Sequence, residues 1–433
     1  MEGTAVGLIG LCLFVVLLFL GMPIGFVMAI VGFLGFGLLR GFHAGLSLLA
    51  TQAFRTSNDY ILGVVPLFTA MGYLAMHMRL SGDLFHAAHR WFGHVRGGIA
   101  IATTIACTIF GAICGTSIGV AAAIGAIALP EMRKFKYKSE LSTGLLSSAG
   151  NLGFLIPPSL VFVIYAIITE QSIGVLFIAG ILPGVLLCLL FIATIYIWCR
   201  LDPSACTLSP PFPWVERLRA VRYVSGVLLV VGIVLAGIYA GLFTPTEAAA
   251  IGVFGVGLVG LLFRRFSREA LTTALRETAL LTGKIYLLIM GAMIFTRFVT
   301  VSEIPLKISL AVSELGLSPF SVLMSMLILY IVTGFFLDII PIVLITAPVL
   351  HPLLVQMGYD PVWISVLVAM TILIGSVTPP FGMNVFALSA MVPDVPISSI
   401  FKGVMPFCVA MLVCLILILL FPQIALFLPS LMG

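Results

Sequence analysis

The chain has 433 residues, of which 61% are hydrophobic and only 9% are charged, against the roughly 25% charge of an ordinary soluble domain. This composition excludes a soluble protein, and the apolar stretches Val6 to Leu20, Val224 to Ala240 and Val404 to Pro422 each indicate a span. The net charge of +5 does not indicate nucleic-acid binding, because the basic residues follow the two sides of a membrane. The sequence predicts an all-α polytopic membrane protein.

The first apolar stretch is expected to remain as a span. Residues Met1 to Thr4 contain no Lys or Arg, and the first basic residue is Arg40. A cleaved secretory signal would begin with a positively charged region.

The chain is predicted to contain two copies of one unit. A shift of 220 residues places Gly21 on Gly241 and Gly32 on Gly252. A shift of 222 places the prolines at 157–158 on those at 379–380. Chance could give one such match in a chain with 43 glycines, but not an ordered series. Internal repeats of this kind are common in secondary transporters.

The basic residues predict how the chain is threaded. Seventeen of the 21 Lys and Arg residues fall in five places, at 79–96, 133–138, 200–222, 264–284 and Lys402. The positive-inside rule puts these segments in the cytoplasm and both chain termini in the periplasm. Because 79–96 and 133–138 then share one side, the apolar stretch 98–130 must enter and leave there as a re-entrant hairpin.

The same rule orients the rest of the chain. Leu141 to Thr169 crosses outward and Ile173 to Cys199 returns, whereas a second hairpin at about 320–350 opens to the periplasm. The two repeats are therefore predicted to be inverted in topology. The chain is predicted to divide into five parts. Residues 1–97 form scaffold helices with an interfacial arm, 98–200 form transport elements, and 201–222 form a cytoplasmic linker. Residues 223–319 form a second scaffold part, and 320–433 form the second transport elements.

Two local patterns predict where helices begin. From Ser81 to Val95 the apolar residues recur at helical spacing, which indicates an amphipathic interfacial helix with Ser81 as its cap. Its partner in the second copy lies at about 303–317. Thr244-Pro245-Thr246-Glu247 has the pattern of a capping box.

Two breaks interrupt apolar spans, at Gly150 to Ser159 and at Gly375 to Asn384. Glycine and paired prolines free backbone carbonyls, which hydrocarbon tolerates only beside protein or a water-filled cavity. Free carbonyls can hold a cation, and the N-terminus of the second half-helix can bind an anion. One break could be a plain proline kink, but two equivalent breaks favour ligand sites.

The two hairpin tips, Gly111 to Ser117 and Thr333 to Asp338, lie at equivalent positions. A tip and a break together could form a cage for Na⁺. Asp338 is the stronger candidate for a functional residue, because burying an ionisable side chain inside a membrane costs free energy and usually serves a function. A structural cap is the alternative role. Its equivalent is Thr116, so only one of the two sites has a carboxylate.

Other chemistry has little support. Asp83, His86 and His89 have a spacing that could place three metal ligands on one helix face, but we interpret them as ordinary interfacial residues. Lys284 is followed by Ile285 rather than Ser or Thr, so no ATP-binding loop is predicted. No nucleophile elbow or acid pair indicates an enzyme. The eight cysteines, mostly in apolar runs, are interpreted as small core residues.

Several strings together resemble a known family. They are CGTSIGVAAAIGAIALPEM from Cys114, GNLGFLIPPS from Gly150, TEQSIG from Thr169, FTPTEAAAIG from Phe243 and GSVTPPFGMN from Gly375. From about residue 6 to 425 the chain resembles the large membrane subunit of the tripartite ATP-independent periplasmic (TRAP) transporters, within the ion-transporter superfamily. This resemblance implies Na⁺-driven uptake of a small organic acid, such as a carboxylate, by an elevator mechanism in the bacterial inner membrane.

The resemblance implies one Na⁺ site at each tip and break, with two or more coupling ions and no other metal or cofactor. The first site would use Gly115, Thr116, Ser117, Gly150, Gly153 and Pro157, and the second Gly334, Asp338, Gly375, Thr378 and Phe381. Substrate contacts are expected from Thr116, Asn151, Ser159, Thr378, Pro380 and Asn384. Many family members carry Asp or Thr where this chain has Val120, so the first site must rely on other oxygens.

Two partners are also implied: a small four-helix membrane subunit and a periplasmic substrate-binding protein, with which specificity largely rests. Nothing in the chain lies outside the duplicated unit, so the small subunit is expected to be a separate chain. A stand-alone Na⁺/carboxylate symporter of the same superfamily is the alternative. An intramembrane enzyme would need catalytic acids or a metal set at membrane depth, and a channel would more often be a symmetric oligomer without paired hairpins.

Overall fold

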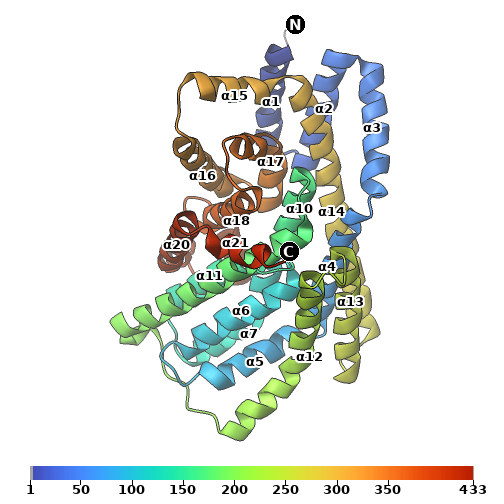
Figure 1. The fold of residues 1–433 in the computed structure, drawn as a ribbon. Helices are drawn as coiled ribbons and strands as arrows, with labels where there is room; N and C mark the ends of the chain where they lie inside the picture. The colour runs from blue at the N-terminus through green and yellow to red at the C-terminus, as the bar shows by residue number, and fades with distance from the viewer. Residues whose placement is uncertain (1–2, 433) are drawn as a thin grey trace.

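Helices form every regular element in the computed structural model, which describes residues 3–432 with the side chains of residues 309 and 313 excepted (Figure 1). The first half contains α1 (Gly3–Phe19), α2 (Ile24–Arg40), α3 (Phe42–Ser57), η1 (Ile61–Gly63), α4 (Val64–His77), α5 (Leu80–Phe92), α6 (Gly98–Cys114), α7 (Ser117–Lys134), α8 (Ser139–Ala149), α9 (Leu152–Leu155), α10 (Leu160–Thr169), α11 (Ile173–Leu201) and η2 (Pro203–Ala205). The second half contains α12 (Trp214–Tyr239), α13 (Pro245–Leu262), α14 (Arg268–Val301), α15 (Ile304–Glu314), α16 (Pro319–Phe336), α17 (Ile339–Gln356), α18 (Pro361–Val377), α19 (Met383–Met391), α20 (Ile397–Leu420) and α21 (Gln423–Ser430).

The lengths of the helices fit a membrane protein. Within the described residues, seven helices are long and apolar enough to cross a bilayer, or up to nine when each bent pair counts as one span. The stretches predicted as spans lie in α1, α12 and α20. Large apolar side chains remain on the outer surface, as Phe19 at 89% and Phe254 at 72% exposure illustrate, which is what contact with lipid requires. The prediction of an all-α polytopic membrane protein is confirmed.

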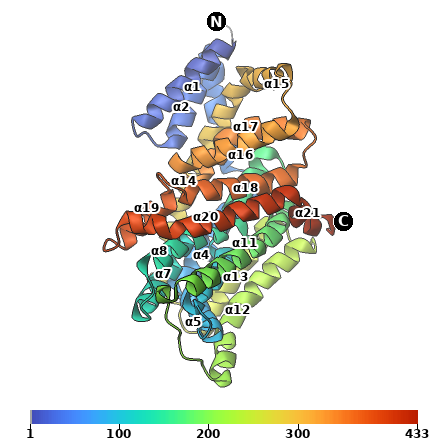
Figure 2. The ribbon, with the colours of Figure 1, turned by 90° about the vertical axis from the view of Figure 1, so that its left-hand side faces the viewer.

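The boundaries of the helices repeat along the chain. Adding 222 to the bounds of α7 gives 339–356, which are the bounds of α17, and the same shift places α6 on α16 to within one residue. Packing between the halves is reciprocal. Helix α8 packs on α20 as α18 packs on α11, and α7 packs on α19 as α17 packs on α10. Figure 2 shows α16, α17, α18 and α20 lying alongside one another in the second half.

One pair of equivalent elements differs in shape. Helix α3 and the segment Ile61–His77, which contains α4, are bent by 56° at the residues between them. The equivalent region of the second half is α14, one continuous helix of 34 residues. The two halves are therefore similar but not identical.

Close helix crossings hold α2, α4, α13 and α14 together. A Cβ atom at Gly32 of α2 would lie 2.7 Å from the backbone nitrogen of Phe295 in α14, and one at Gly291 would lie 2.2 Å from the carbonyl oxygen of Gly25. Only glycine allows the two backbones to approach this closely. These helices form one packed group beside the hairpins and broken helices.

The predicted helix starts had different outcomes. The capping box at Thr244 is confirmed, with the Thr244 hydroxyl accepting from the Glu247 N–H and the Glu247 carboxylate accepting from the Thr244 N–H. The cap at Ser81 was wrong. The chain enters α5 through Arg79 in a left-handed conformation (φ 57°), and Ser81 lies buried inside the first turn. Helices α5 and α15 are the predicted arms, and they lie at opposite ends of the molecule (Figure 1).

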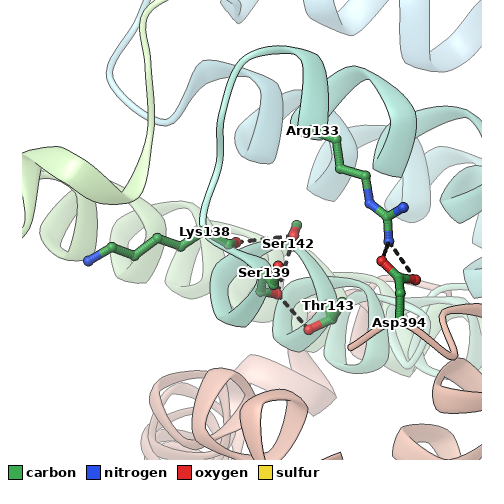
Figure 3. A network of polar contacts seen from close by, with 6 residues as sticks. All are labelled: Arg133, Lys138, Ser139, Ser142, Thr143 and Asp394. Atoms are coloured by element: carbon green, nitrogen blue, oxygen red, sulfur yellow. Dashed lines mark hydrogen bonds and ion pairs between the residues drawn. The ribbon is translucent and has the colours of Figure 1, made fainter. Parts of the chain in front are cut away.

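Polar contacts bring the basic segments together. Arg265 pairs with Asp83 at 2.6 Å and Lys138 with Asp202 at 2.5 Å, which joins 264–284 to 79–96 and 133–138 to 200–222. The indole of Trp91 donates to the carbonyl of Arg217, and the Arg133 guanidinium reaches Asp394 at 2.8 Å (Figure 3). These contacts bring together four of the five basic segments, 79–96, 133–138, 200–222 and 264–284, as a common side of the membrane requires.

Candidate functional site

The first hairpin tip packs on the first break. The chain leaves α6 at Cys114, turns through Gly115 (φ +63°) and Thr116, and begins α7 at Ser117. A Cβ atom at Gly115 would lie 3.2 Å from the carbonyl oxygen of Pro158, and one at Gly150 would lie 2.7 Å from the carbonyl oxygen of Ser117. The tip and the break therefore pack backbone against backbone at two points.

Glycines make this approach possible in both repeats. A Cβ atom at Gly111 in the first hairpin would lie 2.5 Å from the Cα of Gly153 in the first break. In the second repeat, a Cβ atom at Gly334 would lie 2.9 Å from the Cα of Gly375. Gly153 and Gly375 are equivalent positions, and their partners Gly111 and Gly334 differ by one residue in register, so the two copies make a similar contact between backbones.

The paired prolines leave carbonyls without helical donors. The carbonyls of Gly153 and Ser376 would each bond the N–H of the residue four positions later, but those residues are Pro157 and Pro380. The carbonyl of Phe154 loses its helical donor in the same way and accepts from the Ser159 hydroxyl instead. Both Pro-Pro peptide bonds are cis. Each break thus offers free backbone oxygen.

A buried polar network joins the two breaks. Asn151 donates from Nδ2 to the carbonyl oxygen of Leu373 at 3.0 Å and to the hydroxyl of Ser376 at 3.2 Å. Asn384 donates from Nδ2 to Asn151 Oδ1 at 2.5 Å and to the Ser117 hydroxyl at 2.7 Å. Ser117 in turn donates to Asn151 Oδ1 at 3.0 Å. The first tip, the first break and the second break therefore meet at Asn151.

The second tip and break meet through aromatic rings. The rings of Phe336 and Phe381 lie 4.9 Å apart between centroids, and Phe381 remains 45% exposed. Thr378 is partly buried and donates from Oγ1 to the carbonyl oxygen of Ile374 at 2.6 Å. Pro380 is exposed. The side chains at the second tip and break are more exposed than those at the first.

Asp338 caps a helix. Its Oδ1 accepts a hydrogen bond of 2.8 Å from the Ile339 N–H at the start of α17, and the residue is exposed. The structural role considered as an alternative is therefore present. The equivalent residue Thr116 is half-buried, with its hydroxyl 3.4 Å from the sulfur of Cys114.

The predicted site residues thus separate into two groups. The structure gathers Gly115, Ser117, Gly150, Asn151, Gly153 and Asn384 around the first tip, and Gly334, Gly375, Thr378 and Phe381 around the second. Ser159 is buried and caps α10, accepting from the Phe162 N–H. Sequence reasoning missed Phe336 and the role of Ser376. Both lie inside the singled-out strings, but only the fold shows what they contact.

Two of the three residues with metal-like spacing, Asp83 and His89, bind other side chains. Asp83 accepts from both guanidinium nitrogens of Arg265, at 2.6 and 3.0 Å, and His89 lies 3.3 Å from the hydroxyl of Ser209. No group of three or more His, Cys, Asp or Glu that could hold a metal occurs among residues 3–432. Asp83 therefore stabilises the contact between α5 and the start of α14.

A cavity of about 1060 Å³ lies between α4, α5, α7 and the start of α14. Ala122 and Ala126 of α7 form one wall, and His77, Arg79 and Arg265 lie on the other side. The cavity separates a hairpin helix from the group of helices that contains α4 and α14. Composition and spacing gave no signal for it, because its lining comes from four distant segments.

Known proteins resemble this chain over nearly its whole length. The family model described as "Tripartite ATP-independent periplasmic transporter, DctM component" matches residues 11–424. The C4-dicarboxylate TRAP transporter large permease protein DctM of Pseudomonas aeruginosa is 37% identical over 389 residues, which cover 89% of this chain and 90% of that protein. The ectoine/5-hydroxyectoine TRAP transporter large permease protein UehC of Ruegeria pomeroyi is 34% identical over 419 residues, covering 96% and 97%.

A solved structure supports the fold. The YdaH transporter of Alcanivorax borkumensis matches with a TM-score of 0.53 at 14% identity, covering 91% of this chain and 89% of that chain. The two relatives at 37% and 34% identity are named as transporter permeases, not as enzymes. With a family match from residue 11 to 424 and a relative at 37% identity, the chain belongs to the DctM family, the large permease component of tripartite ATP-independent periplasmic transporters.

Proposed function

We propose that this subunit carries a small organic acid, together with two or more Na⁺ ions, across the bacterial inner membrane by an elevator movement. The observation that carries the proposal is the network centred on Asn151, which joins the first tip and the first break to the second break. In this proposal residues 98–200 and 320–425 move together. The other spans, with α5 and α15 as connecting arms, form the scaffold.

The proposed Na⁺ sites use the oxygens at each break. Na⁺ is a hard cation that favours carbonyl and hydroxyl oxygen over sulfur or imidazole. At the first site these oxygens come from Gly115, Thr116, Ser117, Gly150, Gly153 and Pro157, and at the second from Gly334, Asp338, Gly375, Thr378 and Phe381. The free carbonyl of Gly153 and the carboxylate of Asp338 support this proposal.

The proposed substrate site lies between the two breaks. Thr116, Thr378 and Pro380 are at least partly exposed there, so an anionic substrate could reach them, with the N-termini of α10 and α19 nearby in the chain. The side chains of Asn151, Asn384 and Ser159 make hydrogen bonds within the protein. We infer that these three residues shape the site and that Thr116 and Thr378 contact the substrate.

The proposed orientation follows the charges. The face that gathers the basic segments lies in the cytoplasm, which puts both chain termini in the periplasm. The two arms, α5 and α15, lie at opposite ends of the molecule, which supports inverted topologies for the two repeats (Figure 1). The name of the family supports two partners, a small membrane subunit and a periplasmic binding protein.

Ion coupling can be tested by uptake into proteoliposomes that contain the large subunit and its two partners. We expect uptake of radiolabelled C4-dicarboxylates, tested beside other organic acids, only with an inward Na⁺ gradient. A K⁺ gradient and a pH gradient serve as matched controls. Equal uptake rates with a proton gradient and no Na⁺ would contradict the proposed coupling.

The elevator movement can be tested by crosslinking. Phe68 of α4 and Phe177 of α11 face each other across the proposed sliding surface, with ring centroids 5.8 Å apart. We expect that a crosslink between cysteines at these two positions stops uptake. The matched control is a crosslink between Phe14 and Phe295, 5.3 Å apart within the scaffold, which should leave uptake unchanged. Normal uptake with Phe68 and Phe177 joined would indicate a local gate instead.

A stand-alone Na⁺/carboxylate symporter is not favoured, because the matched relatives are large permeases of TRAP systems. Leaving out each partner in turn from the uptake assay separates the two possibilities. Full uptake by the large subunit alone would support the symporter.

A further inference from the structure

A buried polar cluster lies where α10 ends beside the second half of α17. His351 of α17 is only 7% exposed, and its Nδ1 lies 3.0 Å from the hydroxyl of Tyr165 in α10. Its Nε2 lies 3.4 Å from Nε2 of Gln171, in the loop between α10 and α11. The rings of His351 and Tyr165 pack edge to face, with centroids 5.5 Å apart. One histidine therefore joins the second hairpin to the second half of the first broken helix.

Hydrogen bonds fix which way the Gln171 amide faces. Its Nε2 donates to the hydroxyl of Thr169 at 2.9 Å and to the hydroxyl of Ser365 in α18 at 3.1 Å. Each of these hydroxyls already donates its own hydrogen to the backbone carbonyl four residues earlier, at 2.7 Å in both cases. The two hydroxyls therefore only accept from Gln171. Within residues 3–432 the buried Oε1 of Gln171 has no hydrogen-bond partner.

This arrangement suits a neutral histidine and opposes a protonated one. When the neutral ring carries its hydrogen on Nδ1, that hydrogen faces the Tyr165 oxygen and the Nε2 lone pair faces the Gln171 amide hydrogens. Protonation adds a hydrogen at Nε2, opposite an amide nitrogen that only donates. Turning the amide over would bring Oε1 to this hydrogen but would take the Nε2 donor away from both hydroxyls. A protonated ring therefore breaks at least one of these contacts.

We propose that His351 is a proton-binding site, and that a proton bound there loosens the contact between the second hairpin and α10. Histidine is the side chain that ordinarily changes charge between pH 5 and 8. Water lies close to the cluster, because Glu170 and Ser172, on either side of Gln171, are exposed. The contact is made at neutral pH and is weakened as the pH falls.

No charged side chain holds the proton in place. The helices that pack against α17 carry few titratable groups beyond residues 268–286 of α14. They are Tyr165 and the C-cap Glu170 of α10, Tyr330 of α16, the N-cap Asp360 of α18 and Arg297 of α14, while α17 itself begins at Asp338. Across the described part of the chain, no Asp, Glu, Lys or Arg side chain makes a hydrogen bond or ion pair with His351. The polar contacts of its ring therefore decide which protonation state the cluster accepts.

The position of His351 explains the expected effect on Na⁺. It lies about 20 Å along α17 from Asp338, at the end of the hairpin that is away from the tip. Loosening this end frees the helix whose start carries Asp338, so an ion held between the second tip and break leaves more readily. The effect on Na⁺ rests on the proposed function, whereas the proton site does not.

The proton site is tested first without transport. Hydrogen–deuterium exchange of the full chain in detergent is followed at about pH 5.5 and 7.5, with rates corrected for the intrinsic effect of pH. In the wild type, protection at the end of α10 and in the second half of α17 should be at least about fivefold lower at the acid pH, the lower end of typical coupling between sites. His351→Gln should show no such difference, and the control His43→Gln, at an exposed histidine of α3, should retain it. Equal responses of wild type and His351→Gln would overturn the proposal.

A second variant keeps the test decisive if His351→Gln does not fold. Gln171→Glu places a carboxylate, which only accepts, beside Nε2 of His351. The protonated ring then becomes the matched partner, so α10 and α17 should be better protected at the acid pH than at the neutral one. This reversal would support the proton site. An equal loss of protection at both pH values would mean that the cluster is structural only and would overturn the proposal.

The effect on transport is tested next, in proteoliposomes with the same pH on both sides. The Na⁺ half-saturation of the wild type should be at least about fivefold higher at the acid pH, and that of His351→Gln should not change. Comparing the two proteins at each pH removes the titration of the substrate and of the partner subunits. A change in protection without a change in half-saturation would overturn the link to Na⁺ but leave the proton site standing. No Na⁺-dependent uptake at either pH would instead contradict the proposed function.

Discussion

In the first repeat, polar side chains bond the hairpin tip to both breaks. Ser117, Asn151 and Asn384 are buried and hydrogen-bonded to one another. In the second repeat, the tip meets its break through glycine backbones and through the rings of Phe336 and Phe381, which are tilted against each other and exposed.

The two kinds of contact differ in the free energy needed to separate them. Opening a buried polar network leaves donors and acceptors without partners, whereas two rings at a surface can part at a smaller cost. We infer that the first tip and break are held together more firmly than the second. We expect substitutions in the first half to affect the fold and those in the second to affect ion binding.

The largest effect is expected from Asn151→Leu. The change removes the partner of the Leu373 carbonyl and of the Asn384 amide, and a buried group left unpaired costs about 1–3 kcal/mol. We expect a clear fall in the unfolding temperature of the purified protein and loss of uptake. Asn58→Leu, at the exposed end of α3, is the control. An unchanged unfolding temperature would show that the network does not hold the two repeats together.

Thr378→Val should act on Na⁺ and not on the fold. The change removes a hydroxyl beside the second break, and a loss of roughly 1.4 kcal/mol of binding would raise the Na⁺ half-saturation about tenfold. Uptake rates are measured over a range of Na⁺ concentrations. Thr371→Val, in the same helix away from the break, should leave the half-saturation unchanged. Equal values for the two variants would remove Thr378 from the site.

Two substitutions distinguish the two roles considered for Asp338, Na⁺ binding and helix capping. Asp338→Asn keeps an oxygen that can accept from the Ile339 N–H but removes the charge, so it should weaken Na⁺ dependence with little effect on stability. Asp338→Ala removes both and should also lower the unfolding temperature. If Asp338→Asn retains the wild-type Na⁺ half-saturation, Asp338 is a helix cap only.

Phe381→Ala should have a smaller effect. Aromatic pairs contribute about 0.5–1.5 kcal/mol beyond the area they bury, so the second tip should open more often and the Na⁺ half-saturation should rise a few-fold. Phe386→Ala is the control, because Phe386 is similarly exposed and contacts Phe401 rather than the tip. A fall in the unfolding temperature as large as that of Asn151→Leu would contradict the difference between the two halves.

The smallest effect is expected at the ion pair of Arg133 and Asp394, which is exposed on both sides (Figure 3). Hydrogen bonds from the Arg133 guanidinium hold the pKa of Asp394 below its ordinary value. Because the folded pKa is the lower one, any stabilisation is present at neutral pH and is lost as the pH falls through the folded pKa. The unfolding temperatures of wild type and Asp394→Asn should differ slightly at pH 7 and converge in strong acid.

The sequence alone predicts much of this arrangement. The two Pro-Pro breaks predict the discontinuous helices because that pattern is local, and the sidedness of the basic residues predicts the two hairpins. The partners of Asn151 could not be predicted, since Leu373 and Asn384 lie more than 200 residues away and meet it only when α9, α18 and α19 pack. The cap at Ser81 failed because Arg79 adopts a left-handed conformation that a side-chain pattern does not reveal.

The unbroken helix α14 has a consequence for how the protein sits in lipid. Its 34 residues extend about 51 Å at 1.5 Å per residue, well beyond the ~30 Å of hydrocarbon. The excess carries charge, and Glu277 within it pairs with His77 of α4 at 2.8 Å. Moving α14 further into the bilayer would place those charges among the acyl chains. Bilayer thickness should therefore set the height of α14, so that shorter or longer lipids change the distance the hairpins must travel relative to it.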